Sequence, residues 1–498
     1  MSNITNARVS ISKVSLSANS KDGTIVSGLR KEYLPFTGVI TQSIANIAPS
    51  ATPALVIPLV FATAGNGTWL AYLFATIVIA LVGVNLNQFT KRSASAGSIY
   101  SYVVKGLGTN AGFVSGWSLV MAYTLTAGAV LCGFINYANV LLQYTGVTIS
   151  PILIGVVGAV AAWYIAYRDI KLSTKIMLSF EVVSLVLIFA LAVVVLVKNG
   201  FTIDHAQLTL NDVSSTSIRI GLVLAFFSFT GFESAASLGD EAKKPLRTIP
   251  RAVTISAIFV GIFFILLSYT EVLGFTGSTT ALNEAEAPLA LLASKNGVEF
   301  FGPLISIGAL VSFWACFLAC ANAGARVLFT MGRHGIFHVA VGDAHENNKT
   351  PHIAIVITTI LAAVIPLILV GLDNALFDIY GWIGTVATFG FLLNYTLIAI
   401  AAPVYLHREK ELQPKHIVLS VITVLVLLIP IVGSLYPTPD YPYNLFPYVF
   451  VAWLVAGGLW FIIRKSQLPE VSSNIESNVE SVHQYYKDIR VRGDGEGI

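Results

Sequence analysis

The chain has 498 residues, of which 55% are hydrophobic and only 11% charged, and its mean hydropathy is +0.77. A soluble domain carries about 25% charged residues, so this composition excludes a soluble globular protein and indicates that most of the chain lies in a membrane. The net charge of +3 and the scattered basic residues give no patch for nucleic acid, and the three cysteines have neither disulfide-framework nor metal-site spacing.

Twelve apolar runs are long enough to cross a bilayer, which takes about 20 residues of helix. The fold class is therefore an all-α polytopic membrane protein, with no cofactor expected and lipid as its surroundings. The spans are expected at 35–63, 68–89, 112–142, 151–167, 176–198, 217–239, 252–275, 301–330, 353–372, 375–400, 416–434 and 445–464.

Three polar segments flank or interrupt these spans. Residues 1–33 are polar and show no cleavable signal, and 98–113 is expected to form an interfacial turn with a short amphipathic piece. Residues 466–498 are polar, and we expect them to stay a solvated, unstructured tail.

The lysines and arginines set the orientation, because cytoplasmic loops carry an excess of them. When the N-terminus is placed in the cytoplasm, 26 of the 29 basic residues lie on the cytoplasmic side of the membrane. Only Lys198, Arg219 and Lys295 lie on the opposite side. The sequence therefore predicts a multi-pass protein of the cell membrane with both termini in the cytoplasm.

The first span contains a predicted break. Pro49 and Pro53 cannot donate helix hydrogen bonds, and hydroxyl residues surround them. The pattern favours unwinding at about 48–52 over the alternative of a kinked but continuous helix, which membranes also tolerate.

A matching break is predicted in the sixth span. Ser228, Thr230 and Gly231 interrupt an aromatic run, and Glu233 follows directly. A carboxylate at membrane depth is costly and is a functional candidate by default, and a pair of interrupted helices in the two halves of a transporter points to its binding site.

Two crossed breaks expose backbone groups of both polarities. The amides of Ser50 and Ala51 would begin a half-helix and suit a carboxylate, whereas the carbonyls near Ile47, Phe227 and Thr230 suit an ammonium. The pair would therefore bind a zwitterion without any charged side chain.

The stretch FSFTGFESAASLGDEAKKPLRTIPRA at 227–252 resembles the sixth-helix signature of the amino acid–polyamine–organocation superfamily. The similarity extends to KRSASAGSIYSYV at 91–103 and to ANAGARVLFTMGRHGIF at 321–337. The resemblance implies two inverted five-helix repeats, at 34–198 and 217–400, followed by two helices at 414–465. It also implies alternating access around a site at the middle of the membrane.

Matched by position, the resemblance makes Phe227 an aromatic gate, Gly231 the unwound turn and Glu233 the coupling residue. The chain departs from the family pattern in three places. The usual glycine-serine-glycine of the first span is replaced by 48–51, which reads Ala-Pro-Ser-Ala. The family's K-N-P element reads Lys-Lys-Pro at 243–245, and the fifth span has no lysine near Ser184.

Two glutamates have competing interpretations. Glu233 is either a coupling residue that binds a proton or a structural acceptor for the broken backbone, and these roles are compatible. Glu181 is either a second proton-binding carboxylate or, as we favour from the sequence, an interfacial residue paired with a cytoplasmic Arg or Lys.

These patterns predict a secondary active transporter that moves amino acids or related organic amines across the cell membrane by alternating access, and not an enzyme. The first alternative is a carrier of polyamines or ethanolamine-type amines, which would need Glu233 or Glu181 to face the substrate. A different class, an ion-only carrier or channel, would carry flux without organic solute. No nucleotide-binding motif appears, so coupling is expected to be proton symport, exchange or, last, sodium symport.

Overall fold

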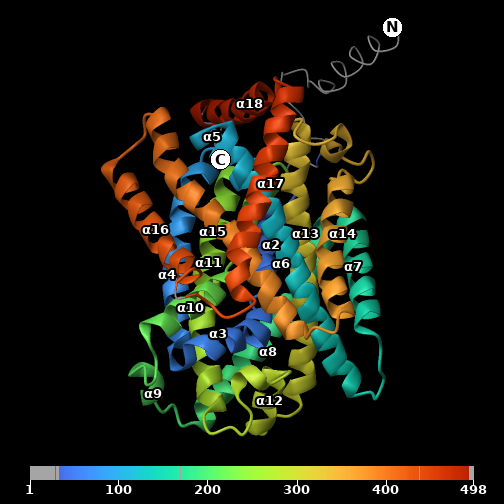
Figure 1. Cartoon of the computed structure of the whole chain (residues 1–498), viewed down its shortest axis with the longest axis vertical. Coiled ribbons are helices and arrows are strands. Elements are labelled where there is room, and N and C mark those ends of the chain that lie inside the picture. The colour runs from blue at the N-terminus through green and yellow to red at the C-terminus, as the bar shows by residue number, and fades with distance from the viewer. Residues whose placement is uncertain (1–28, 30–32, 169, 437, 493–498) are drawn as a thin grey trace.

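The computed structural model describes residues 29, 33–168, 170–436 and 438–492. The regular elements in this part of the chain are all helices, and they form one elongated bundle (Figure 1). This arrangement confirms the all-α polytopic fold.

Within the described ranges, eleven helical segments are long and apolar enough to cross a membrane. The first of them, Phe36–Thr90, has 55 residues, far more than the roughly 20 that one crossing needs. It turns at Gly65, whose φ of 51° lies in the left-handed region, so it contains both the first and the second predicted span.

The remaining long helices follow the predicted order. They are α6 (Thr109–Gln143), α7 (Pro151–Arg168), α8 (Ile170–Lys198), α10 (Ser215–Phe227), α11 (Pro245–Phe275), α13 (Phe301–Arg333), α14 (His352–Gly371), α15 (Leu376–Arg408), α16 (Pro414–Gly433) and α17 (Phe446–Gln467).

Short helices lie between the long ones, and a further helix of 22 residues, α18, lies at the chain end. They are η2 (Gly65–Gly67), α5 (Ile99–Leu107), α9 (His205–Leu208), η4 (Leu282–Glu284), α12 (Pro288–Lys295), η5 (Val339–Gly342), η6 (Tyr443–Leu445) and α18 (Val471–Arg492). Helix α5 confirms the short piece expected between the second and third spans.

The first span is broken where the prolines predict. Helix α2 (Phe36–Ile47) ends at Ala48, which has a left-handed φ of 50°. The chain re-enters as a π-helix, η1 (Thr52–Val56), and then α3 (Ile57–Ala64). Pro53 lies in the first turn of the new segment, where its missing N–H costs no hydrogen bond.

The sixth span is broken at its glycine. Helix α10 ends at Phe227, and the chain continues after a turn as the 3₁₀ helix η3 (Phe232–Leu238). Gly231 has a φ of 91°, and a Cβ there would lie 2.6 Å from the amide nitrogen of Asn46. Only glycine fits both the backbone angle and this close approach.

The two broken segments lie together inside the bundle. Helix α2 packs against η3, α8, α11 and α13, while α10 packs against α3 and α4 (Thr68–Thr90). The long helices α13 and α15 both pack against α6 beside them. Both breaks are therefore shielded by protein, the setting in which irregular backbone is tolerated at membrane depth.

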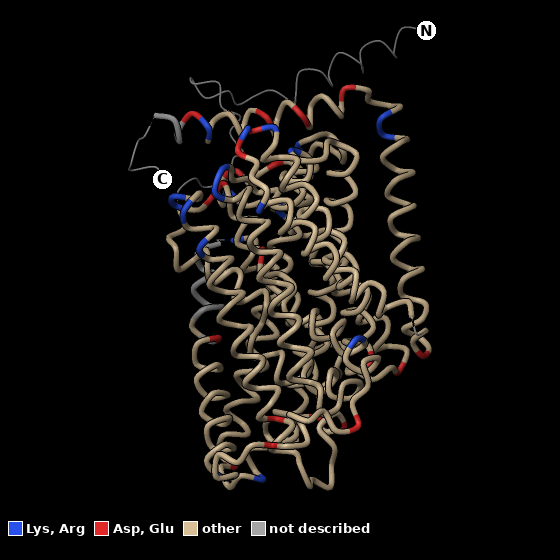
Figure 2. The backbone as a smooth tube through the Cα atoms, turned by 90° about the vertical axis from the view of Figure 1, so that its left-hand side faces the viewer, with Lys and Arg blue, Asp and Glu red and all other residues tan. Residues whose placement is uncertain are grey.

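Charged residues gather at one end of the bundle, which we call the basic end (Figure 2). Helix α18 lies across this end, and α9 and α12 lie at the opposite end (Figure 1). The expectation of an unstructured tail after residue 466 is wrong, since α18 covers Val471–Arg492. Val471, Ile475 and Val479 follow helical spacing and are buried. Burial of this apolar stripe offsets the conformational entropy that the segment loses when it becomes ordered.

Candidate functional site

The two interrupted spans are joined by hydrogen bonds between α2 and η3. The Ser43 hydroxyl of α2 donates to the carbonyl of Phe232 at 2.6 Å and accepts from the amide of Ala235 at 3.2 Å. The Ser234 hydroxyl donates to the Gln42 carbonyl at 3.2 Å. All of these groups are buried, so α2 is fixed against η3, the half of the sixth span that leads to the basic end.

The amides of the first break already have partners within the protein. Ser50 N–H donates to Oε1 of Glu181 at 3.0 Å, and Ala51 N–H donates to the carbonyl of Ala48 at 2.9 Å. Glu181 comes from α8 and is 1% exposed. A carboxylate at the start of a half-helix is stabilised by the N–H groups and the helix dipole, so Glu181 occupies the place where we expected a ligand carboxylate.

The sequence interpretation of Glu181 as an interfacial residue paired with Arg or Lys is therefore wrong. A polar residue six positions after Lys175 can as readily face inward as outward along a helix, and the sequence of α8 alone did not show which. Its role in coupling stays a prediction.

Three oxygen atoms around Glu181 lack hydrogen-bond partners among the described residues. They are Oε2 of Glu181 and the hydroxyls of Ser50 and Ser312. Both hydroxyls lie close enough to the carboxylate to interact with it, and all three residues are buried. Unpaired buried oxygens are costly, so this cluster is suited to accept the N–H groups of a bound cation.

The second break holds the other predicted carboxylate. Glu233 is fully buried and accepts hydrogen bonds from Tyr123 at 2.6 Å and Tyr395 at 2.5 Å. Tyr123 belongs to α6 and Tyr395 to α15, so Glu233 ties the second break to two long helices. Tyr123 was one of several polar residues in the third span, and nothing in the sequence pointed to Tyr395.

The remaining predicted residues line the second break. Phe227 lies edge-on to Tyr380 with 5.8 Å between ring centroids, and a Cβ on Gly384 would lie 2.8 Å from the Phe227 ring. The Phe227 carbonyl accepts from the amide of Thr230 at 3.1 Å and from its hydroxyl at 2.8 Å. This carbonyl, an expected ammonium ligand, is therefore engaged within the turn, as the amides of the first break are.

A buried ion pair closes the site toward the basic end. Arg326 of α13 donates to both oxygens of Glu241, at 2.8 Å and 3.2 Å, and each side chain is 1% exposed. Beside it the chain entering α2 pairs with the segment after η3, since Leu34 N–H donates to the Glu241 carbonyl at 2.9 Å. Sequence reasoning missed this pair, although an arginine inside an apolar span is itself a signal.

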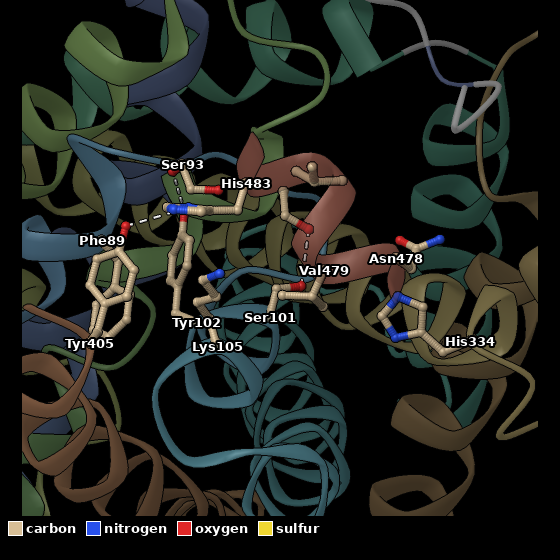
Figure 3. A pocket seen from close by; sticks show the side chains of 12 residues that line it. Phe89, Ser93, Ser101, Tyr102, Lys105, His334, Tyr405, Asn478, Val479 and His483 are labelled. Carbon is tan, nitrogen blue, oxygen red and sulfur yellow. Dashed lines mark hydrogen bonds between the residues drawn. The ribbon is translucent and has the colours of Figure 1, made fainter. Parts of the chain in front are cut away.

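At the basic end, α18 covers a cavity lined by Phe89, Tyr102, Tyr405, His334 and His483, among others (Figure 3). Tyr100 and His334 Nδ1 hydrogen bond at 2.6 Å. Burial lowers the pKa of His334 to about 4, against the opposing effect of its hydrogen bond with Asn478.

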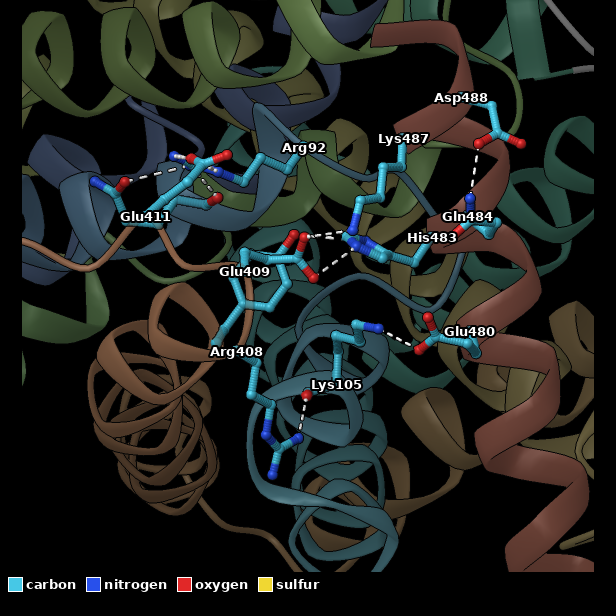
Figure 4. A network of polar contacts seen from close by, with 12 residues as sticks. Arg92, Lys105, Arg408, Glu409, Glu411, Glu480, His483, Gln484, Lys487 and Asp488 are labelled. Atoms are coloured by element: carbon cyan, nitrogen blue, oxygen red, sulfur yellow. Dashed lines mark hydrogen bonds and ion pairs between the residues drawn. The ribbon is translucent and has the colours of Figure 1, made fainter. Parts of the chain in front are cut away.

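Ion pairs attach α18 to the two halves of the bundle (Figure 4). Lys105, at the end of α5, pairs with Glu480. Glu409, just after α15, pairs with His483 at 3.1 Å and Lys487 at 3.2 Å. Helix α18 therefore bridges segments that belong to different halves of the chain.

Taken together, the apolar helices, the two opposed breaks and the buried polar groups between them define a multi-pass membrane transporter. The amino acid permease family model matches residues 38–466. The chain therefore belongs to the amino acid permease family, whose members are permeases.

Several relatives support this assignment. The branched-chain amino acid permease BcaP of Bacillus subtilis is 24% identical over 375 residues, covering 70% of this chain and 76% of that protein. The methylthioribose transporter of the same organism is 24% identical and covers 91% and 97%. The low-affinity putrescine importer PlaP of Escherichia coli is 28% identical and covers 66% and 72%.

A solved structure shares the fold. MhsT, crystallised in complex with L-phenylalanine, superposes with a TM-score of 0.55 at 16% sequence identity. The match covers 81% of this chain and 99% of MhsT. The three relatives are thus a branched-chain amino acid permease, a methylthioribose transporter and a putrescine importer, and MhsT shows the shared fold.

Proposed function

We propose that this protein is a secondary active transporter of the cell membrane that moves amino acids or related organic amines by alternating access. The observation that carries the proposal is the pair of breaks joined through Ser43 and Phe232. Rigid helices on either side of a shared unwound region can tilt about it, which opens one side and closes the other. The basic end is then cytoplasmic, as the distribution of Lys and Arg requires.

The substrate site in this proposal is formed by backbone at Ile47, Ser50, Ala51, Thr230 and Gly231, with Phe227 as the aromatic wall. The groups of these residues that now bond within the protein exchange those partners for the ligand. Such exchange keeps every buried polar group satisfied in both states. Coupling is assigned to Glu233 and Glu181, through proton symport or exchange, with sodium as the remaining option.

One observation favours a second candidate, a carrier of amines that lack a carboxylate. Glu181 already supplies a carboxylate to Ser50 N–H, and the hydroxyls of Ser50 and Ser312 lie beside this carboxylate. An amino acid would have to displace this carboxylate, whereas an ammonium ion would add to it. A diamine or an amino alcohol is the simplest ligand that fits the second arrangement.

The two candidate functions predict different effects on binding when the carboxyl group of the ligand is removed. We would measure thermal stabilisation of the purified full-length protein by free amino acids, by their amides and by the matching decarboxylated amines, because a ligand that binds the folded state raises the melting temperature. Stabilisation by free amino acids alone supports the first candidate. Equal or greater stabilisation by the amines supports the second, and no stabilisation by any member contradicts both.

Glu181→Gln supplies the second arm of this experiment. For an amine carrier the variant loses the charge that binds the ammonium. The affinity for amines, measured from thermal stabilisation, should then fall about tenfold or more. For an amino acid carrier it removes a competitor for Ser50 N–H, and affinity should rise. Glu346→Gln, at an exposed position, is the matched control and should change neither.

A further inference from the structure

A fourth buried glutamate stands apart from those already described. The described part of the chain buries Glu181, Glu233, Glu241 and Glu271. The first three accept hydrogen bonds at one or both carboxylate oxygens. Both oxygens of Glu271 lack a partner among the described residues, although the residue is only 1% exposed.

Glu271 is buried without a hydrogen-bond partner among the described residues but lies near one end of its helix. It lies on α11 four residues before that helix ends at Phe275, at the end of the bundle opposite the basic end. Four residues correspond to about 6 Å of helix rise, so a proton has a short way to travel from that surface. A carboxylate buried without hydrogen bonds or a counter-charge is neutralised rather than left ionised.

Two tyrosines connect Glu271 with the two breaks. Helix α11 packs against α4, which carries Tyr72, and both Tyr72 and Tyr137 of α6 lie within electrostatic range of Glu271. The Tyr72 hydroxyl is hydrogen-bonded to the Ser228 hydroxyl at 3.0 Å, in the turn that breaks the sixth span. The Tyr137 hydroxyl donates to the carbonyl of Ala54 at 3.0 Å, in the π-helix that follows the break of the first span.

Other elements packed against α11 also carry titratable groups, and none of these groups hydrogen bonds to Glu271 in the described part of the structure. They are Glu181 and Lys198 of α8, Glu233 of η3, Glu284 of η4 and Lys295 of α12. The electrostatic partners of Glu271 are thus the two neutral phenols.

We propose that Glu271 is a proton-binding site whose occupancy is coupled to both broken helices through Tyr72 and Tyr137. With the proton bound, the carboxylic acid is neutral and both tyrosines keep their bonds to Ser228 and Ala54. Loss of the proton, which leaves to water at the nearby surface, creates a strong acceptor. The phenolic hydroxyls then turn toward the carboxylate and release the two broken segments.

A proton fits this site better than an alkali cation. A hard cation requires several oxygen ligands at once, whereas the hydroxyls of Tyr72 and Tyr137 already bond to Ser228 and Ala54. The link to transport rests on the proposed function, but the binding of a proton by Glu271 does not.

The proton itself is tested by infrared spectroscopy of the purified full-length protein at neutral pH. The carbonyl stretch of protonated carboxylic acids should be present in wild type and should lose the intensity of one group in Glu271→Gln, while Glu299→Gln, at an exposed position, should retain the full intensity. No loss in Glu271→Gln would overturn the proposal. Disappearance of the band when sodium replaces choline in the buffer would overturn it in favour of a cation site.

Coupling is tested in vesicles with a pH-sensitive dye and the substrate chosen by thermal stabilisation. Glu271→Gln should flatten the pH dependence of uptake, so that rates at about pH 6 and about pH 8 become equal. Tyr137→Phe and Tyr72→Phe should weaken the dependence in part. A wild-type pH profile in Glu271→Gln would overturn the coupling.

The remaining outcomes also discriminate. If wild type itself carries no substrate, the proposed function has failed, and the infrared result still decides the proton site. If Glu271→Gln does not fold, Glu271→Asp keeps a titratable group, and its shorter side chain should shift both the infrared band and the pH profile. An unchanged band and profile in Glu271→Asp would contradict the proposal.

Discussion

Glutamates serve different purposes at the breaks and at the basic end. Glu181 and Glu233 lie at membrane depth and bond to neutral donors, a backbone amide and two phenols. At the basic end, Glu409 just after α15 and Glu480 of α18 pair with cations. In the low dielectric of the bundle each polar contact is strong, and removing one partner costs much stability. At the basic end, water and salt screen the ion pairs and weaken them.

The largest effect should come from the buried ion pair. Arg326→Ala leaves Glu241 without its partner at 1% exposure, and a buried pair broken in this way costs about 3–5 kcal/mol. Thermal unfolding in detergent should show a large drop in melting temperature. Lys487→Ala, which removes a half-exposed cation from α18, is the control and should cost about 0–1 kcal/mol. Equal losses of stability in the two variants would contradict the contrast between ion pairs inside the bundle and ion pairs at the basic end.

Next in size is the turn of the second break. Gly231→Leu combines a strained positive φ with a side chain driven into Asn46, 2.6 Å from the Cβ position. Each effect costs about 1–3 kcal/mol, and we expect substrate affinity to be lost along with stability. Gly65→Leu is the matched control, because it has a φ of 51° and open space around its Cβ. Unaltered affinity in Gly231→Leu would place the substrate site elsewhere.

Glu233→Gln should act on transport more than on folding. The amide keeps one acceptor for Tyr123 or Tyr395 and loses the charge, so the stability cost is about 1–2 kcal/mol. Uptake should fall about tenfold or more, or lose its coupling, with membrane insertion intact. Initial rates in vesicles at several pH values measure this, and wild-type uptake with a normal pH dependence would remove Glu233 from the mechanism.

The smallest effect concerns the attachment of α18 in acid. Burial opposes the charge of Glu409, but His483, Lys487 and Lys105 hold its pKa below the ordinary value, so its contribution is present above the unfolded pKa and is lost as pH falls. Burial, reinforced by Lys105, lowers the pKa of His483 despite Glu409, and its protonation in acid also favours release. Both shifts predict weaker docking of α18 in acid, through His483 as the pH falls below about 6.5 and through Glu409 as it falls below about 4.5.

Limited proteolysis of the full-length chain as a function of pH tests this. Cleavage after residue 468 should accelerate in acid in wild type and should be fast at every pH in Glu409→Ala. Lys410→Ala, a neighbouring basic position in the loop after α15, is the control and should follow wild type. Cleavage independent of pH in wild type would show that the apolar stripe of α18 alone holds it.

The positions of both breaks could be predicted because their causes are local. Pro53 and Gly231 act on the backbone wherever they occur in a helix, and each proved to lie at its break. The apolar stripe of α18 is equally local, and we overlooked it because the segment is polar overall. Glu271 carried the same signal as Glu233, a carboxylate within an apolar span, but no glycine or proline beside it drew attention.

The sequence by itself determined the number and order of the spans, the gathering of basic residues at one end and the unwinding of the first and sixth helices, because hydropathy, charge and backbone constraints are properties of short stretches. The tertiary structure decided which groups meet there: Glu181 at the amide of Ser50, two tyrosines at Glu233, Arg326 at Glu241, and no hydrogen-bonding group of the described chain at Glu271. These partners come from helices tens to hundreds of residues away, and only the packing of the bundle sets which face of each helix they approach.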